Sequence, residues 1–479
     1  MLHTGMIQSA SSVISGFIRV TLCLLSLSIY VFYFFSSILL CFLCFMSKSV
    51  AKNLILLSLC LLFSCRQDNS NKLNDYTVID VINNFGKYQE ISVSEFVSEL
   101  EHIPLDTNDS CLIAGVRCLI VTPSHIFIQG YVGGSAPGLL LPGATRCFAF
   151  SRDGRFICEI GRVGQGPGEY QNMNGLFIDE KKQLLYIETY RTLLEYSWDG
   201  VFRRSINKPQ AMNGDFISGV FFVRDNVFIG HIPNRRDNEM CKFNLFDITG
   251  QVFKSFDRHV KFERPGRGVS MYDNAMPPYS ISEDIFVKEY ANDTLFCLNE
   301  QNELIPQFVF DLGKYTYTAE TGNKEVGQQM MMMDEIIIPH SLRPVIGTHN
   351  YVYFSVSVRN TNIPKPAWIN ERAQGFMILG IYDISNKKTR LLYQEDPIIR
   401  KEGLINDLDG GFSFWPKYYT SSNELVDVYQ AHEMKEMLTE QYFAGHTIKN
   451  PQAHQKLKEL LSNLDYEDNP VVVIAKLKK

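Results

Sequence analysis

One short pattern recurs along this chain and limits its fold more than any other feature. In three places an aromatic residue stands four positions before a turn glycine, with apolar residues on both sides. The three places are Phe150-Ser-Arg-Asp-Gly154, Tyr196-Ser-Trp-Asp-Gly200 and Phe246-Asp-Ile-Thr-Gly250. A glycine between two apolar segments predicts a β-hairpin, because the tight turns that suit paired strands need a positive φ. The pattern therefore predicts three similar hairpins.

Two weaker copies extend the series. Leu298 stands four positions before Asn302, and Tyr382 stands four before Asn386, where Asn would adopt the left-handed conformation that Gly adopts elsewhere. Successive turn residues are 46, 50, 52 and 84 residues apart. Four strands every 40–50 residues or so is the period of β-propeller blades. The longest spacing predicts an insertion, which includes residues 328–333, rather than two regular blades.

The clearest unit holds four short apolar segments separated by polar turns, namely Gly175–Asp179, Leu184–Glu188, Leu193–Ser197 and Val201–Ile206. Strands of this kind, broken by Gly, Asn and Asp, continue from about residue 75 to residue 420. One four-stranded blade cannot bury both faces of its sheet, so blades must stack around an axis. We therefore expect an all-β chain with a β-propeller over residues 75–420.

Residues 421–479 follow a different period. Ser421-Ser-Asn-Glu424 matches a capping box, and apolar residues at helical spacing after it predict a helix from Leu425 to Tyr442. A second helix is expected from Asn450, which precedes a proline. The chain then ends in an apolar strand that starts at Pro470. We expect this strand to pair with the open edge of the first or last blade and to close the ring.

The N-terminal part of the sequence has a composition of its own. Residues 1–64 carry three formal charges, all basic, and the first acidic residue is Asp68. Within this prefix, residues 20–45 are uncharged and long enough to span a bilayer. A signal-peptide pattern follows, with a short basic segment from Met46 and an apolar core over Leu54–Phe63.

The segment Leu62-Phe-Ser-Cys65 resembles a bacterial lipobox, in which the cysteine becomes lipidated and N-terminal after cleavage. We therefore expect Cys65 to carry a lipid anchor that holds the protein on a membrane, with a linker over residues 65–74. Arg66 stands where lipoproteins retained at the inner membrane have an aspartate, which favours the outer membrane.

Two start sites are consistent with the sequence. Translation from Met46 would make residues 1–45 an artefact upstream of a complete lipoprotein signal. Translation from Met1 would make residues 20–45 a true membrane helix and would argue against processing at Cys65. A third interpretation is that Cys65 is a plain cysteine at the end of a membrane anchor.

The charge balance excludes one class of partner. The 479 residues carry a formal net charge of −6, and the 415 residues after the prefix hold 43 basic and 52 acidic residues, a net charge of −9. Proteins that bind nucleic acid without sequence preference carry a strongly basic face. We therefore expect no nucleic-acid partner.

The sequence predicts no metal site and no cofactor. It has six cysteines after Cys65 and no Cys-x-x-Cys pair among them, and we expect Cys147 and Cys158 to be buried, unbonded thiols. Residues 406–410, Asn-Asp-Leu-Asp-Gly, alternate oxygen ligands as calcium loops do, but Lys417 replaces the acid at position twelve, which favours a turn.

Three segments carry a resemblance to a known family. They are Gly161-Arg-Val-Gly-Gln-Gly-Pro-Gly-Glu-Tyr170, Tyr290-Ala-Asn-Asp-Thr-Leu-Phe296 and Asn406-Asp-Leu-Asp-Gly-Gly-Phe-Ser-Phe-Trp-Pro416, and the closing Asn469-Pro-Val-Val-Val is similar as well. Together with the lipobox, they resemble the six-bladed β-propeller lipoproteins of Bacteroidetes-type bacteria, distant relatives of the NHL-repeat propellers. The resemblance implies a six-bladed propeller on the outer membrane and implies little chemistry.

The glycine-rich segment after residue 160 supplies the candidate ligand-binding residues, which are Arg162, Gln165, Glu169 and Tyr170. It lacks the Gly-Lys-Ser/Thr of a phosphate loop, and its proline argues against the helix that a dinucleotide site needs. Two interpretations remain open: these side chains connect two blades, or they face a ligand.

No catalytic motif is intact in the sequence. We therefore expect a membrane-anchored binding or interaction module for a glycan, peptide or protein. The alternative is a propeller enzyme, a lyase or hydrolase, with a site in the central channel. Its metal ligands would be inward histidines, for which His231, His340 and His349 are the candidates.

Overall fold

The structure is a computed structural model of the whole chain. It describes residues 76–132, 145–211, 214–233, 239–259, 279–281, 284–289, 292–316, 336–339, 345–359, 362–373, 375–394 and 402–478. The N-terminal prefix, Cys65 and residues 328–333 lie outside this part. Within the described residues, no helix is long and apolar enough to cross a membrane.

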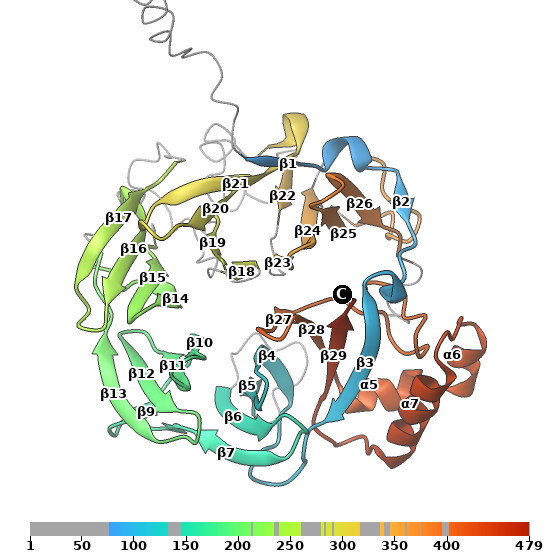
Figure 1. Cartoon of the computed structure of the whole chain (residues 1–479), viewed down its shortest axis with the longest axis horizontal. Helices are drawn as coiled ribbons and strands as arrows, with labels where there is room; N and C mark the ends of the chain where they lie inside the picture. The colour runs from blue at the N-terminus through green and yellow to red at the C-terminus, as the bar shows by residue number, and fades with distance from the viewer. Residues whose placement is uncertain are drawn as a thin grey trace, which may run out of the picture. The chain divides into compact units, whose positions relative to one another are not determined.

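Residues 76–478 form a propeller of six blades, which confirms the predicted fold (Figure 1). Blade 1 consists of β4 (Gly115–Val121), β5 (His125–Tyr131), β6 (Thr145–Ser151) and β7 (Phe156–Ile160). Blade 2 consists of β10 (Gly175–Asp179), β11 (Leu184–Glu188), β12 (Thr192–Ser197) and β13 (Phe202–Asn207), close to the four segments predicted. Blade 3 consists of β14 (Ser218–Arg224), β15 (Val227–His231), β16 (Cys241–Asp247) and β17 (Val252–Asp257).

Of the remaining three blades, the sixth combines strands that are far apart in the sequence. Blade 4 consists of β18 (Tyr279–Ile281), β19 (Asp284–Val287), β20 (Thr294–Leu298) and β21 (Leu304–Asp311). Blade 5 consists of β23 (Ile346–Gly347), β24 (Tyr351–Arg359), β25 (Gly375–Asp383) and β26 (Lys388–Leu392), with β22 (Ile336–Pro339) beside β24. Blade 6 consists of β27 (Tyr418–Tyr419), β28 (Glu424–Tyr429), β29 (Val471–Leu477) and β3 (Val97–Pro104).

The hairpins behave as the repeated pattern predicts, with one correction. Gly154, Gly200 and Gly250 have φ values of 89°, 86° and 84°, and Asn302 has a φ of 59°. In the fifth copy the left-handed residue is Lys387, with a φ of 52°, and not Asn386 as expected. The reason is that the Asn386 side chain and backbone both donate hydrogen bonds to Asp383, so the turn closes one residue later.

The N-terminal part of the propeller follows the outer edges of three successive blades. Strand β1 (Thr77–Asp80) pairs in parallel with β21 of blade 4, and β2 (Tyr88–Gln89) pairs in parallel with β26 of blade 5. The short helices η1 (Ile82–Asn84) and η2 (Val93–Glu95) connect them, and β3 is the outermost strand of blade 6. We call residues 77–104 the belt.

The C-terminal strand closes the ring, as predicted, but in the middle of a blade. Strand β29 lies between β28 and β3 and pairs with both in antiparallel fashion. The last blade therefore combines strands from the two ends of the chain. The edge of β29 that would otherwise be unpaired is therefore covered by β3, a strand of the belt.

The helix predicted from Leu425 to Tyr442 is wrong over its first part. Glu424–Tyr429 is strand β28, and helices α5 (Ala431–Met437) and α6 (Glu440–Ala444) follow it. The capping box fails because Asn423 adopts a left-handed turn and the Glu424 carboxylate accepts hydrogen bonds from Arg152. The strand is buried on both faces, so its apolar residues do not alternate.

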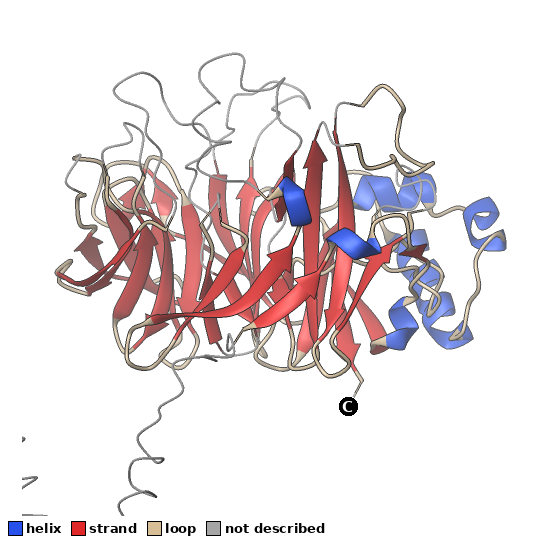
Figure 2. Cartoon of the chain, turned by 90° about the horizontal axis from the view of Figure 1, so that it is seen from above, coloured by secondary structure: helices blue, strands red, loops and turns tan. Residues whose placement is uncertain are grey.

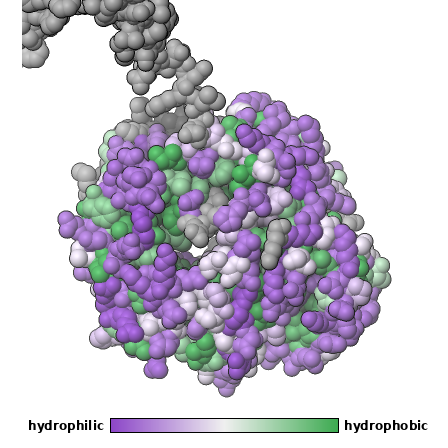
Figure 3. Space-filling view, in the orientation of Figure 1, coloured by the Kyte–Doolittle hydropathy of each residue, from purple (hydrophilic) through white to green (hydrophobic). Residues whose placement is uncertain are grey.

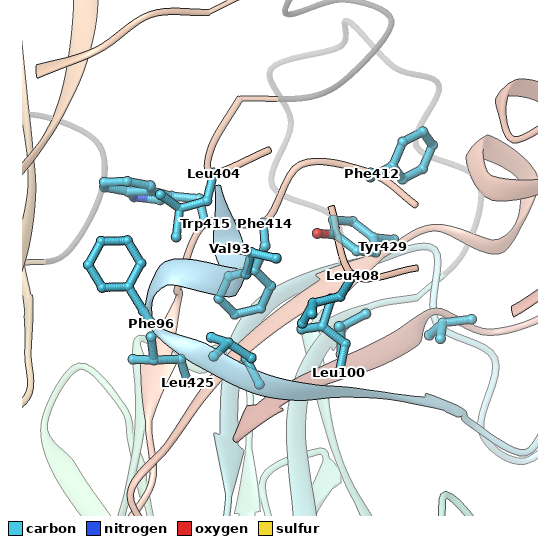
Figure 4. Close-up of a cluster of buried hydrophobic side chains, with 14 of the residues drawn as sticks. Val93, Phe96, Leu100, Leu404, Leu408, Phe412, Phe414, Trp415, Leu425 and Tyr429 are labelled. Carbon is cyan, nitrogen blue, oxygen red and sulfur yellow. The ribbon is translucent and has the colours of Figure 1, made fainter. Parts of the chain in front are cut away.

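The second predicted helix is confirmed as α7 (Pro451–Asn463), whose first turn is capped by the Asn450 side chain. In the sequence, all three helices stand between β28 and β29, the second and third strands of blade 6. Their apolar residues join a core with the belt and with β28, in which Val93, Phe96, Leu408, Phe414 and Tyr429 are buried (Figure 4).

The two faces of the propeller differ in the length of their connections. Eleven connections on one face, from β4–β5 to β27–β28, contain two to five residues. On the opposite face, connections such as those from Asp257 to Tyr279 and from Leu392 to Tyr418 are far longer. We call these the short-turn face and the long-connection face, and Figure 2 shows the short turns gathered along one side.

Ring closure is expected to carry much of the stability. Replacing Ile474, which is fully buried in β29, by Ala should lower the free energy of unfolding by about 2–5 kcal/mol, because it leaves a cavity between blade 6 and its neighbours. The matched control is Ile305→Ala on the outer strand β21, where the side chain is 40% exposed and the loss should stay below about 1 kcal/mol. Urea unfolding measures both, and equal losses would contradict the role given to closure.

Candidate functional site

The innermost strands of the six blades enclose a central channel. These strands are β4, β10, β14, β18, β23 and β27, and Figure 3 shows a hollow at the centre of the ring in the space-filling view. In blades 1, 2, 3 and 6 the inner strand is paired on one edge, with the second strand of its blade, so its other edge faces the axis, whereas β18 and β23 also pair with each other at Ile281 and Gly347. Side chains that remain exposed on these strands are therefore candidates for contact with a ligand.

The channel is narrowed toward the short-turn face. Tyr418 of β27 packs against apolar residues of blades 1 and 2, although its own blade is blade 6. Burial raises the pKa of its hydroxyl well above the usual value. Beside it, the Ser421 hydroxyl donates a hydrogen bond of 2.7 Å to the Glu180 carboxylate of blade 2. We therefore expect the wider end of the channel to be the one at the long-connection face.

Arg117 is an exposed charged residue on the inner strand of blade 1. The pairing of β4 with β5 passes from Val116 directly to Cys118, so Arg117 occupies a β-bulge and has no partner residue in the register. Its guanidinium donates hydrogen bonds to the carbonyl oxygens of Met173, at 2.8 Å, and of Asn174, at 3.2 Å. These carbonyls directly precede β10, so the guanidinium lies at the long-connection end of the channel.

A layer of buried polar side chains lies between blades at the same end. The Gln129 amide donates a hydrogen bond of 3.0 Å to the carbonyl of Met173, and a Glu188 oxygen accepts one of 3.0 Å from the backbone N–H of Val220. Each bond joins one blade to the chain that enters the next. Gln129 and Glu188 occupy equivalent positions on β5 and β11, as His231 does on β15.

The strongest member of this layer is an ion pair. The Lys208 ammonium lies 2.7 Å from the Glu188 carboxylate, and both side chains are 1% exposed. Burial raises the pKa of Glu188 and lowers that of Lys208, and each charge counteracts the shift of the other. The pair is retained because either ion alone would be buried without a counter-charge.

Blade 4 contributes a second pair of buried charges to the layer. Burial lowers the pKa of Lys288 to about 8 and raises that of Asp293 to about 6, and each of the two opposes the shift of the other. On the other side of the same blade, the His259 imidazole lies 2.7 Å from the Glu289 carboxylate and stacks on Phe296. Perturbed ionisable groups of this kind are concentrated near the wide end of the channel.

The ligand-binding residues that the sequence predicts lie away from the channel. Arg162 and Glu169 lie in the two-stranded sheet of β8 (Arg162–Val163) and β9 (Glu169–Tyr170), in the connection between blades 1 and 2. This sheet lies beside the outer strand β13, since Tyr196 donates a hydrogen bond to the carbonyl of Gly168 and Gly168 contacts the Phe202 ring.

The four candidate side chains do not share one environment. Arg162, Gln165 and Glu169 are exposed, and Glu169 accepts a hydrogen bond from the backbone of Gly166. Tyr170 is 2% exposed and packs between the two blades. Tyr170 therefore connects blades, and the ligand-binding role of the other three stays a prediction.

Sequence reasoning missed Arg117 and the polar layer. A signal for the layer exists, because the second strands of blades 1 to 4 each run through apolar residues to a polar one, in Ile-Phe-Ile-Gln129, Leu-Tyr-Ile-Glu188, Phe-Ile-Gly-His231 and Ile-Phe-Val-Lys288. No comparable signal marks Arg117, since a bulge depends on the pairing register.

The candidate metal ligands are not brought together. His231 ends β15 at the long-connection face, whereas His349 lies in the short turn between β23 and β24 on the opposite face. His340 lies outside the described residues. Among the residues that the structure describes, no group of three or more His, Cys, Asp or Glu side chains could hold a metal ion.

Comparison with known proteins places the chain in a family. The model of the family described as "Domain of unknown function (DUF4934)" matches residues 76–476, which is the whole propeller. The chain belongs to the DUF4934 family. No curated protein matches its sequence.

One solved structure similar to this DUF4934 chain supports its fold. A "Putative exported protein" from Bacteroides fragilis is 18% identical, covers 84% of this chain and 100% of its own, and has a TM-score of 0.58. A member of the duf4221 family from Bacteroides vulgatus is 12% identical, with coverage of 80% and 98% and a TM-score of 0.42. Virginiamycin B lyase from Staphylococcus aureus is 10% identical, with coverage of 62% and 89% and a TM-score of 0.31. The similarity to the first structure supports the fold alone. The TM-scores of the other two are too low to support any conclusion.

Two segments of the DUF4934 chain that carry the family resemblance have structural roles here. The Asp409 carboxylate accepts hydrogen bonds from the Asn406 amide and the Gly411 backbone, so this segment is a turn, as predicted. The neighbouring Asp407 binds Ser94 of the belt and Lys449 of the helical insertion. In the closing segment, Asn469 donates to two carbonyls and accepts from one N–H of the connection that enters blade 1.

The cysteines of the DUF4934 chain are free within the described residues, as expected for Cys147 and Cys158. Both lie on blade 1, and Cys147 is fully buried, but Cys158 is partly exposed, contrary to the prediction, because it lies on the outer strand β7. Burial raises the pKa of both thiols. The protonated forms therefore dominate at neutral pH.

The buried ion pair generates a prediction. Glu188→Gln should lower the free energy of unfolding by about 3–5 kcal/mol, because it leaves the Lys208 ammonium buried without a counter-charge. The double variant Glu188→Met with Lys208→Met should recover most of the loss, because no charge is then buried. Urea unfolding checks both, and a double variant no more stable than Glu188→Gln would contradict the role of the pair.

Proposed function

We propose that this chain is a lipid-anchored protein of the cell envelope whose propeller binds a ligand at the wide end of its central channel. The observation that carries the binding role is the asymmetry of the ring. Tyr418 and the short turns lie at one end of the ring, while the connections that join the strands at the other end are longer, and the Arg117 guanidinium lies at that end. Binding residues of propellers and other scaffolds are commonly carried by such connections.

The charges beneath the long-connection face support binding rather than stability alone. Lys288 and Asp293 are shifted from their usual pKa values mainly by burial, which means that both are held in the ring at a cost in free energy. Such a cost is typical of sites selected for recognition. The ligand classes that suit an enclosed polar channel are a glycan, a peptide or an extended segment of a protein.

The anchoring part of the proposal rests on the lipobox-like segment that ends at Cys65. A similar solved structure comes from a protein described as exported, which is consistent with an envelope location. We place the propeller at the outer membrane because Arg66 replaces the aspartate that would retain a lipoprotein at the inner membrane.

Metabolic labelling tests the anchor. In a bacterial host that processes lipoproteins, the full chain should incorporate radioactive palmitate, and Cys65→Ala should not, because the thiol is the acceptor of the lipid. Cys60→Ala, which changes another cysteine of the same apolar segment, should keep the label. Labelling of Cys65→Ala at the wild-type level, or no labelling of the wild type, would overturn the anchor.

Occlusion of the channel tests the binding site. Gly115 begins the inner strand β4, and a Cβ added there meets the Tyr131 ring at an ordinary contact distance of 3.5 Å, so Gly115→Tyr should fold and should add a large ring to the innermost strand at the long-connection end. A panel of neutral and acidic oligosaccharides and short peptides is screened by thermal shift against the wild type. Ligands found in this way should bind Gly115→Tyr at least about tenfold more weakly.

The control variants for this screen are Arg162→Ala and Glu169→Ala, on the outer sheet of β8 and β9. Both should bind the same ligands as the wild type does. Loss of binding in these two variants with retention in Gly115→Tyr would move the site to the outer sheet and would refute the channel.

A further inference from the structure

Five arginines form ion pairs that the structure describes, and Arg117 is not one of them. Arg146, Arg152, Arg155, Arg204 and Arg390 each lie beside a carboxylate. Arg117 has no carboxylate partner among the described residues, and its two hydrogen bonds go to backbone carbonyls. Within the part of the chain that the structure describes, its charge is therefore not balanced by a carboxylate.

The surroundings of Arg117 direct it toward the channel. Its neighbour Val116 packs against the core shared by blades 6 and 1, and Cys118 packs against the core shared by blades 1 and 2. Arg117 is the extra residue of the bulge between them and remains exposed. Its guanidinium reaches the carbonyls of Met173 and Asn174, which directly precede the inner strand β10, so it lies between the inner strands of blades 1 and 2.

The two carbonyl contacts hold the guanidinium in place. A guanidinium has five N–H donors, of which the bonds to Met173 and Asn174 use two. The remaining donors are fixed in one plane, and this geometry matches the two oxygens of a carboxylate. Little side-chain entropy remains to be lost when a ligand binds.

We infer that Arg117 is the anchor for a carboxylate group of the ligand, so that the channel selects acidic ligands over neutral ones. This inference rests on the proposed binding role of the channel and adds the chemical class of what it takes. The carboxylate can come from an acidic sugar or from the C-terminus of a peptide, and both present the same two oxygens.

The test uses pairs of probes that differ in the carboxylate alone. Tri-galacturonate is compared with its methyl ester, and tri-alanine is compared with its C-terminal amide, by isothermal titration calorimetry on the purified full chain. For one of the two pairs, the acid should bind the wild type about tenfold to a hundredfold more tightly than its blocked form, which is the range for hydrogen bonds to charged groups. The pair that shows the difference identifies the source of the carboxylate.

Substitution of the arginine provides the second arm. Arg117→Met should bind the acid no better than the blocked probe, and Arg117→Lys, which keeps the charge and loses the planar fork, should fall between. The matched control is Arg203→Met, an exposed arginine on the outer strand β13, which should bind as the wild type does. If Arg117→Met does not fold, Arg117→Lys and the probe pairs decide the question.

Two results would overturn the inference. One is that neither acid binds the wild type more tightly than its blocked form, and the other is that Arg117→Met or, failing that, Arg117→Lys keeps the full preference for the acid. If the channel were not the binding site, the result would differ from both of these. Gly115→Tyr would then bind all ligands of the screen as tightly as the wild type. Neutral ligands lost in Gly115→Tyr, with no preference for acids, would refute the role of Arg117 alone.

Discussion

The pairing of strand β29 with strand β3 is the interaction on which the rest of the propeller depends. It runs from Val471 opposite Pro104 to Leu477 opposite Val97, and it joins the two ends of a long chain within one sheet. The blade it completes presents apolar faces to both of its neighbours. The inner strands can surround a single channel because this blade fills the gap between blades 5 and 1. The position of Arg117, on the blade next to the closure, therefore depends on contacts between residues at opposite ends of the sequence.

The hairpins could be predicted because their signal is local. An aromatic residue, a turn glycine and alternating apolar residues lie within ten positions, and the predicted strands of blade 2 differ from the observed ones by about one residue. Strand β28 could not be distinguished from a helix, because both of its faces are buried and its apolar residues form a nearly continuous run. Strands were predicted from about residue 75, but nothing in the sequence indicated which blades the belt would join. Its strands β1 and β2 are short, and what makes them strands is a partner hundreds of residues away.

The candidate site likewise contains residues that local sequence predicts and residues whose positions depend on distant parts of the chain. The segment from Gly161 to Tyr170 attracted attention because its composition is unusual, yet its exposed side chains lie beside an outer strand. Arg117 has no unusual neighbours in the sequence and gains its position from a shift in strand register. The buried polar residues between blades are intermediate: their positions repeat along the sequence, but their partners belong to the next blade. Composition thus pointed to connections between blades, whereas the register of the strands decides which side chains reach the axis.

The belt has a consequence for the order of assembly during synthesis. Its three strands pair with segments that end at Asp311, Leu392 and Leu477, in the same order in which the ribosome makes them. The N-terminal segment can therefore dock first on blade 4, then on blade 5, and last on blade 6, without releasing any earlier contact. Until the final residues are available, β3 has no partner within its own blade. Completion of the ring is thus a single late step with a very long loop to close, and such steps set the rate at which a chain folds.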